Sequence, residues 1–312
     1  RPLISKPWSG TGKFMSWTGK PGNRKVTLGL ILRLTPLLLP FGVLFCGGVF
    51  LTVCQSLGIF TPLPFTGGIL AAYGVVLSDP SFFASFGFSM GVALASAAGS
   101  VALGTFLAYR VWHLPRSLAG TALVYKIPLI LPHIAVAFVV LVFWSRSGIL
   151  ASAAWHLGLI QAMHEFPNVL YSGWGLGMVL AYTLKGTPFA MLLILALLVR
   201  FDARQIQTAA MLGASRLRIF FAVVLPRLAP AMHTSFIILF LYSFGAFDIP
   251  FILSESRPGM LSLNVFELYF RHDLARRPEA MAILTLMFSF AVIFIIAYSR
   301  TVTRLENGVR KL

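Results

Sequence analysis

The sequence predicts an all-α membrane protein with six transmembrane helices and both termini in the cytoplasm. The first observation is composition, because the 312 residues are 58% hydrophobic and only 11% charged, whereas about a quarter of a soluble domain is charged. The second is a set of apolar runs long enough to cross a bilayer as helices. The third is that Lys and Arg residues are concentrated in every second connection between those runs.

The apolar runs define six predicted spans. They lie at residues 34–57, 83–109, 123–144, 174–199, 229–253 and 280–299. The third span carries Pro128 and Pro132, and proline breaks the helical hydrogen-bond pattern, so we expect that helix to be bent or to begin late.

The second span is rich in small residues that allow helices to approach closely in lipid. These residues are Gly87, Gly91, Gly99, Gly104, Ala93, Ala95, Ala97 and Ala98.

Orientation follows from the basic residues, since Lys and Arg accumulate in cytoplasmic segments. They are most frequent before the first span, after the second, after the fourth and after the sixth, and sparse in the other connections. We therefore expect a cytoplasmic tail over residues 1–33, with an interfacial helix possible at its end, a membrane domain over 34–299 and a cytoplasmic tail over 300–312. The outer segments 58–82 and 146–173 are half apolar and are expected to form short helices along the interface.

Motifs for chemistry are absent from the sequence. The N-terminal Gly-Lys pairs lack the spacing and the hydroxyl residue of a phosphate-binding loop, and neither a zinc-ligand pattern nor a nucleophile elbow occurs. The formal charge of +16 fits the topology of a membrane protein better than nucleic-acid binding. We expect no cofactor, no metal site and no enzymatic activity in this chain.

Placing an ionisable side chain inside a membrane span costs free energy, so such residues are rare and are candidates for lining a solute path. Lys185 precedes Gly186, Thr187 and Pro188 in the fourth span, which predicts a helix break that frees backbone groups. The alternative is that Pro188 only kinks the helix and Lys185 pairs with a neighbouring helix. His133 is expected to be a hydrogen-bonded packing residue.

The fifth span supplies the other candidate path residues. Asp248 lies in its predicted outer half and can face a polar cavity, together with Tyr242, Ser243 and Phe247. Lys185 would suit an anionic solute and Asp248 a cationic one.

The basic connection over residues 201–227 is predicted to form two short helices. Asp202 and Gln205 form a plausible capping box for the first, Gly213 ends it, and Ser215 caps a second helix over residues 216–224. Pro226 is expected to end that helix by holding Leu225 extended. The second helix places Leu217, Phe220, Phe221 and Val224 on one apolar side.

This connection resembles the cytoplasmic signature loop of type I ABC importer permeases, whose pattern is Glu-Ala-Ala, three residues, Gly, and later Leu-Pro. The positions that carry the resemblance are Gln207, Thr208, Ala209, Gly213, Ala214, Ser215, Arg216, Phe220, Leu225 and Pro226. The resemblance extends from about Asp79 to Leu312. The departure is Gln207, which replaces the Glu of the pattern and removes a carboxylate.

The resemblance implies the type I importer permease fold and a coupling role for the loop, which would dock into a groove of a separate ATPase subunit. It implies a second permease subunit in a heterodimer or a homodimer, two ATPase subunits that use ATP and Mg, and a periplasmic or lipid-anchored solute-binding protein. The location would be the bacterial inner membrane. The sequence is most similar to the polyamine, ferric-ion and thiamine-type branch, with sulfate- and phosphonate-type importers as rivals. The competing class is a secondary transporter or channel that needs no ATPase.

Overall fold

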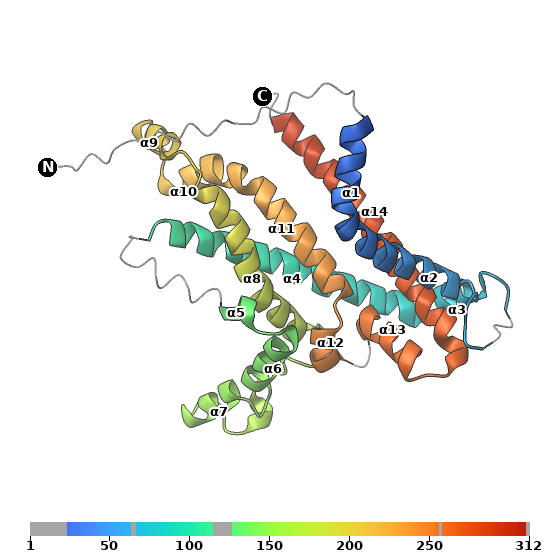
Figure 1. Ribbon diagram of the computed structural model, residues 1–312. Helices are drawn as coiled ribbons and strands as arrows, with labels where there is room; N and C mark the ends of the chain where they lie inside the picture. The colour runs from blue at the N-terminus through green and yellow to red at the C-terminus, as the bar shows by residue number, and fades with distance from the viewer. Residues whose placement is uncertain (1–23, 64–66, 115–126, 256–257, 310–312) are drawn as a thin grey trace. The chain divides into compact units, whose positions relative to one another are not determined.

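The computed structural model describes residues 24–63, 67–114, 127–255 and 258–309, and every regular element within them is a helix (Figure 1). Six helical segments are long and apolar enough to cross a membrane. They are Arg33–Ser56, Pro80–Trp112, His133–His156, Leu176–Leu198, Arg216–Gly245 and Leu274–Arg304. The predicted all-α architecture with six spans is confirmed, whereas the cytoplasmic placement of the termini stays a prediction.

The chain divides into two compact units, Arg1–Val49 and Phe50–Leu312. The described part of the first is helical throughout, with α1 (Arg24–Phe41) followed by a π-helical turn, η1 (Gly42–Cys46), and by the start of α2 (Gly47–Ser56). From Arg33 to Val49 most of its apolar side chains are exposed. The predicted tail over residues 1–23 lies outside the described residues.

The second unit holds the remaining helices. These are α3 (Ala71–Ser78), α4 (Pro80–Trp112), α5 (Ile127–Ile130), α6 (His133–Trp144), α7 (Ile149–His156), η3 (Met163–Glu165), α8 (Leu176–Leu198), α9 (Ala203–Met211), α10 (Arg216–Ile219), η4 (Phe220–Val224), α11 (Leu225–Gly245), α12 (Asp248–Leu253), α13 (Leu261–Phe270), η5 (Leu274–Arg276) and α14 (Arg277–Val309).

The contact between α4 and α8 is close enough to need small residues on both helices. A Cβ atom on Gly104 would lie 2.8 Å from the Cβ of Ala190, and one on Gly186 would lie 2.5 Å from the Oγ of Ser100. The predicted small-residue surface is therefore used at Gly104, whereas Gly87 has open space around it. Close backbone approach of this kind stabilises helix pairs in lipid, where little hydrophobic driving force is left.

The third span begins late, as Pro128 and Pro132 predict. After the short α5, the chain turns at Pro132 and α6 begins at His133. The outer segments do contain short helices, namely α3, α7 and the 3-10 turn η3.

The predicted fifth span, 229–253, is wrong at both ends. Its helix begins at Arg216 and stops at Gly245, because Ala246 adopts an extended conformation (ψ 145°) and a new helix, α12, starts at Asp248. The sixth helix, α14, is longer than predicted and continues to Val309.

Candidate functional site

The basic connection folds as a helix, a glycine turn and a second helix. The carboxylate of Asp202 caps α9 by accepting a hydrogen bond from the backbone N–H of Arg204 at 3.0 Å. At the other end Gly213 has a φ of +82°, and Ala214 donates its backbone N–H to the carbonyl of Ala209 at 3.1 Å. A left-handed residue with this backward bond is a Schellman cap, which favours glycine because a side chain would be strained there.

The second helix does not end at Pro226, and this part of the prediction is wrong. Leu225 is helical (φ −58°, ψ −43°), and α10, η4 and α11 form one continuous helix from Arg216 to Gly245. The turn before Pro226 is π-helical, and such a turn shifts the hydrogen-bond register by one residue. The proline is thereby accommodated, since its missing N–H and its ring conflict with a regular α-helical turn.

The inner side of this segment is fixed to the membrane helices by an apolar cluster, which we call the base cluster. Its buried members come from α4, α8, α10, η4 and α11, and are Ala108, Met191, Ile194, Leu198, Ile219, Val224 and Leu228. The rings of Phe220 and Tyr109 meet edge to face with centroids 4.8 Å apart. Movement of α9 and α10 is therefore tied to movement of the three long helices beneath them.

The outer side of the segment is apolar and exposed, and we call Met211, Leu212, Leu217 and Phe221 the exposed face. Met211 and Leu212 are 88% and 82% exposed. Single exposed apolar side chains are common on protein surfaces, whereas several neighbouring ones form a patch that marks an interaction site. In Figure 1, α9 lies beyond the end of α8, and α10 leads directly into α11.

The predicted coupling residues are divided between these two sides. Those exposed are Gln207, Thr208, Gly213, Ser215, Arg216 and Pro226, and those partly buried are Ala209, Ala214, Phe220 and Leu225. Ala209, Ala214 and Phe220 pack against the base cluster, so they support the segment from below.

Lys185 makes contacts with a neighbouring helix. Its ammonium donates hydrogen bonds to the backbone carbonyls of Pro128, Leu129 and Leu131, at 2.8, 3.0 and 2.6 Å. These carbonyls belong to the end of α5 and the turn beyond it, where a helix leaves acceptors unpaired. The alternative that Lys185 pairs with a neighbouring helix is the one that the structure shows.

The predicted break at Pro188 is wrong, because α8 is unbroken from Leu176 to Leu198. Thr187 is buried and donates its hydroxyl to the carbonyl of Thr183 at 2.7 Å. This back-bond occupies the Thr187 hydroxyl within its own helix.

Four polar or aromatic side chains from α6, α8, α11 and α12 converge, and we call His133, Tyr182, Tyr242 and Asp248 the aromatic cluster. The His133 Nδ1 lies 3.9 Å from the Asp248 Oδ2, and the His133 and Tyr242 rings are 5.0 Å apart. The rings of Tyr182 and Tyr242 meet edge to face at 6.1 Å. Of the predicted path residues, Tyr242 and Asp248 thus come together, and His133 joins them.

The other two path residues of the predicted fifth span are not part of the aromatic cluster. Ser243 is buried, and the Phe247 ring packs at a tilt against those of Phe251 and Phe266, at centroid distances of 5.2 and 4.5 Å. Sequence reasoning missed Tyr182, which carries no charge and resembles an ordinary span residue.

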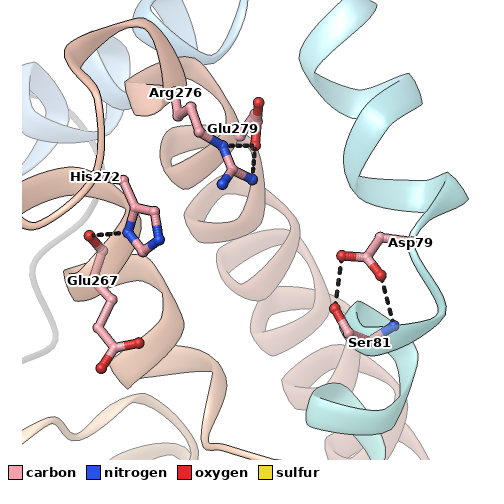
Figure 2. A network of polar contacts seen from close by, with 6 residues as sticks. All are labelled: Asp79, Ser81, Glu267, His272, Arg276 and Glu279. Atoms are coloured by element: carbon pink, nitrogen blue, oxygen red, sulfur yellow. Dashed lines mark hydrogen bonds and ion pairs between the residues drawn. The ribbon is translucent and has the colours of Figure 1, made fainter.

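A polar cavity of about 790 Å³ lies between α3, α4, α13 and α14, and we call it the α3–α14 cavity. Figure 2 shows its polar groups, with Arg276 donating to the Glu279 carboxylate at 2.8 and 3.0 Å and Ser81 donating to that of Asp79. These hydrogen bonds from Ser81 lower the pKa of Asp79. His272 donates its Nδ1–H to the backbone carbonyl of Glu267 at 2.9 Å.

The α3–α14 cavity lies at the start of α4, whereas the base cluster lies at its end. The cavity is lined by Ser81 and Ser85 of α4 and the base cluster contains Ala108. Since a helix rises 1.5 Å per residue, the two are about 35–40 Å apart along α4. Sequence reasoning missed the cavity. The available signal was that Asp79, Glu267 and Glu279 fall at helix junctions in a chain with only 9 acidic residues.

Metal-ligand geometry is missing from the part of the chain that the structure describes, where no group of three His, Cys, Asp or Glu side chains could hold an ion. The arrangement instead places an exposed apolar face at one end of the long helices, polar groups between the helices, and a polar cavity at the other end.

Known proteins with similar sequences are transporter subunits. The "Probable ABC transporter permease protein" of Pyrococcus horikoshii is 24% identical over 287 residues, which are 86% of this chain and 94% of that protein. The "Molybdenum transport system permease protein" of Escherichia coli K12 is 28% identical over 189 residues, 59% of this chain and 77% of that protein.

Solved structures support the same fold. A bacterial ABC transporter involved in the import of the acidic polysaccharide alginate superposes with a TM-score of 0.73, at 17% identity, over 90% of this chain and 96% of that chain. The same kind of transporter in complex with an alginate-bound periplasmic protein gives a TM-score of 0.71 at 15% identity.

The family model described as "Binding-protein-dependent transport system inner membrane component" matches residues 100–311. This range includes the continuous helix, the exposed face and the last span. The chain therefore belongs to the family of inner-membrane permease components of binding-protein-dependent ABC importers.

Proposed function

We propose that this chain is one of two permease subunits that carry a small polar solute across the bacterial inner membrane, driven by ATP that partner subunits hydrolyse. The observation that carries this proposal is the exposed face of α9 and α10, which sits on a base cluster shared by α4, α8 and α11.

The coupling step follows from this arrangement. An ATPase groove that closes around Met211, Leu212 and Leu217 would bury apolar side chains, each worth about 1.5–3 kcal/mol when fully covered. Because the base cluster is close-packed, a displacement of the exposed face moves the attached helices as rigid bodies. The chain would then open alternately to each side of the membrane while binding neither ATP nor Mg itself.

The delivery step is assigned to the opposite end. A solute-binding protein would dock near the α3–α14 cavity, about 35–40 Å from the base cluster along α4. The solved alginate transporter in complex with its periplasmic protein supports a partner of this kind. The second permease would complete the path, as a heterodimer or a homodimer.

The experiment compares two leucines of equal exposure. Leu217, on the exposed face, is 72% exposed, and Leu157, at the end of α7, is 75% exposed. The tagged permease is purified from its own host as wild type, Leu217→Ser and Leu157→Ser, and the retained ATPase subunits are quantified. We expect Leu217→Ser to weaken retention about tenfold or more, since losing a buried leucine costs at least about 1.5 kcal/mol, and Leu157→Ser to retain the wild-type amount.

A secondary transporter or channel is the competing outcome. It would be supported if the wild-type subunit retains no ATPase and if transport in proteoliposomes follows an ion gradient without ATP.

A further inference from the structure

A second pocket lies beside the start of α8, and we call it the α6–α8 pocket. Its volume is about 510 Å³. It is lined by residues 144–147 at the end of α6, and by side chains of η3 and of the segment that leads into α8. It shares no lining residue with the base cluster, the aromatic cluster or the α3–α14 cavity, so the coupling and delivery steps proposed above leave it without a role.

The level of this pocket in the membrane follows from α8. Leu170, which lines the pocket, lies against the first turn of α8, because its Cδ2 would be 2.9 Å from a Cβ on Gly177. The 23 residues of α8 rise over about 35 Å, close to the hydrocarbon thickness of a bilayer, about 30 Å. In Figure 1, α9 follows the other end of α8. The α6–α8 pocket therefore lies at the membrane boundary opposite to α9.

Aromatic side chains around the pocket agree with this level. Trp144 and Tyr171 line it, and Trp174, in the same segment before α8, is exposed. Trp and Tyr are enriched at the boundary between the bilayer and water, where their apolar rings and polar N–H or O–H groups lie among the lipid headgroups. The pocket is thus within reach of phospholipid headgroups.

The polar lining of the pocket carries positive charge. It consists of Ser145, Arg146, Ser147, His164 and Asn168, and neither Asp nor Glu is among the lining residues. Arg146 forms no ion pair with any residue that the structure describes. Glu165, the neighbour of His164 in sequence, accepts a hydrogen bond from the backbone N–H of Gln161 at 2.8 Å and does not line the pocket. The charge of Arg146 is therefore available to an anion.

An apolar stripe on α6 leads toward this arginine. Ile134, Phe138 and Val142 are exposed, and residues four apart lie on the same face of a helix. The stripe ends four residues before Arg146. A ligand with apolar chains along α6 and an anionic group beside Arg146 would match both features.

We propose that the α6–α8 pocket binds one anionic phospholipid, with its phosphate on the Arg146 guanidinium and its acyl chains along α6. A guanidinium donates two parallel hydrogen bonds to a phosphate. The absence of a lining carboxylate favours an anionic headgroup over a zwitterionic one, whose ammonium would find no counter-charge in the pocket. This inference requires that the chain spans a membrane, and it does not depend on partners that hydrolyse ATP.

Native mass spectrometry of the purified, delipidated complex tests the proposal. The probes are phosphatidylglycerol, phosphatidylcholine with the same acyl chains, and inorganic phosphate as a competitor without acyl chains. The variants are Arg146→Gln and Arg146→Lys. Arg271→Gln is the matched control, because Arg271 is likewise exposed but lies outside the pocket and has Glu267 as its ion-pair neighbour. Each preparation is checked for monodisperse elution.

Wild type and Arg271→Gln are expected to bind one phosphatidylglycerol per copy of this chain, about fivefold more tightly than phosphatidylcholine, because one cation attracts the anionic headgroup. Arg146→Gln should bind phosphatidylglycerol at least about tenfold more weakly, as expected when hydrogen bonds to a charged group are lost. Arg146→Lys should lose less, since it keeps the charge but not the two parallel bonds. Inorganic phosphate at the concentration of the lipid should not displace it.

The proposal is overturned if wild type binds both lipids equally, if Arg146→Gln binds phosphatidylglycerol as wild type does, or if Arg271→Gln loses as much affinity. Displacement of the lipid by equimolar phosphate would identify a site for a free anion instead. A variant Arg146→Gln that keeps the lipid but no longer binds the solute-binding protein would assign the pocket to protein docking. A complex without ATPase would contradict the proposed function and leave the lipid measurement intact.

Discussion

Substitution of Gly213 tests the coupling role of the segment α9–α10. The space around this position and its backbone conformation can be considered separately, because a Cβ would have room there whereas the φ angle disfavours any residue other than glycine. Its φ is +82°, and no atom lies within 4 Å of the position that a Cβ would occupy. Within the described part of this chain a Cβ at Gly213 therefore meets no clash, leaving aside its two neighbours in sequence. The effect on the isolated subunit then comes from the left-handed backbone. That conformation costs an L-residue about 1–2 kcal/mol, and a β-branched residue is a true outlier there.

Gly213→Val should consequently destabilise the Schellman turn by about 1–2 kcal/mol or more, which shifts the population of the native turn about 5- to 30-fold. Gly213→Asn should have a smaller effect, since asparagine tolerates this conformation. The buried base cluster lies outside the turn, so membrane insertion should be unchanged. Coupled ATP hydrolysis of the purified complex is the measurement, and we expect the order wild type, Asn, Val.

Gly158 is the matched control, because it also has a positive φ, +68°, with open space around it. Gly158→Val introduces the same backbone strain at the end of α7, away from the exposed face. Its ATP hydrolysis should stay coupled. The coupling role of Gly213 is refuted if Gly213→Val hydrolyses ATP as wild type does, or if both valine variants lose activity equally.

Three further outcomes are expected. Gly186→Ala should destabilise the purified protein by about 1–3 kcal/mol through overpacking, because its Cβ would lie 2.5 Å from the Ser100 Oγ, whereas Gly87→Ala, in open space, should leave the melting temperature unchanged or raise it. Asp79→Ala should lower the free energy of unfolding by about 1 kcal/mol, because the helix α4 loses its cap. The hydrogen bonds from Ser81 lower the pKa of Asp79 in the folded state. The stabilisation by Asp79 is therefore present above its unfolded-state pKa and is lost as the pH falls through its folded-state pKa. Melting curves at pH 7 and pH 3 should thus differ less in the variant than in wild type. Gln207→Glu restores a carboxylate on an exposed position, so it should strengthen ATPase retention by no more than about fivefold, in a salt-sensitive manner, and equal retention at low and high salt would argue against an ion pair there.

The spans could be predicted from the sequence because a helix that crosses a bilayer must meet a simple requirement of length and composition. A helix must be apolar over about 20 residues to cross a bilayer, so the hydropathy of residues 83–109 and 174–199 located α4 and α8 to within a few residues. The turn at Gly213 was also predictable, since its chemistry is local. The helical conformation at Pro226 was not predictable, because the π-helical turn Phe220–Val224 before it accommodates the proline, and that turn packs on the base cluster formed by three distant helices.

The sequence by itself determined that this chain is a helical membrane protein with six spans and a helix–glycine–helix connection between the fourth and fifth spans. Composition, hydropathy and the positions of glycines are properties of the chain alone. Tertiary structure decided what the polar residues do. Lys185 and Asp248 are equally unusual as charges in an apolar chain. The Lys185 ammonium donates to three carbonyls 54 to 57 residues away in sequence, whereas the Asp248 side chain is 55% exposed, with His133 as its neighbour at 3.9 Å. Which side chain finds its hydrogen-bond partners depends on helices that meet only in the folded protein, and no local pattern encodes that meeting.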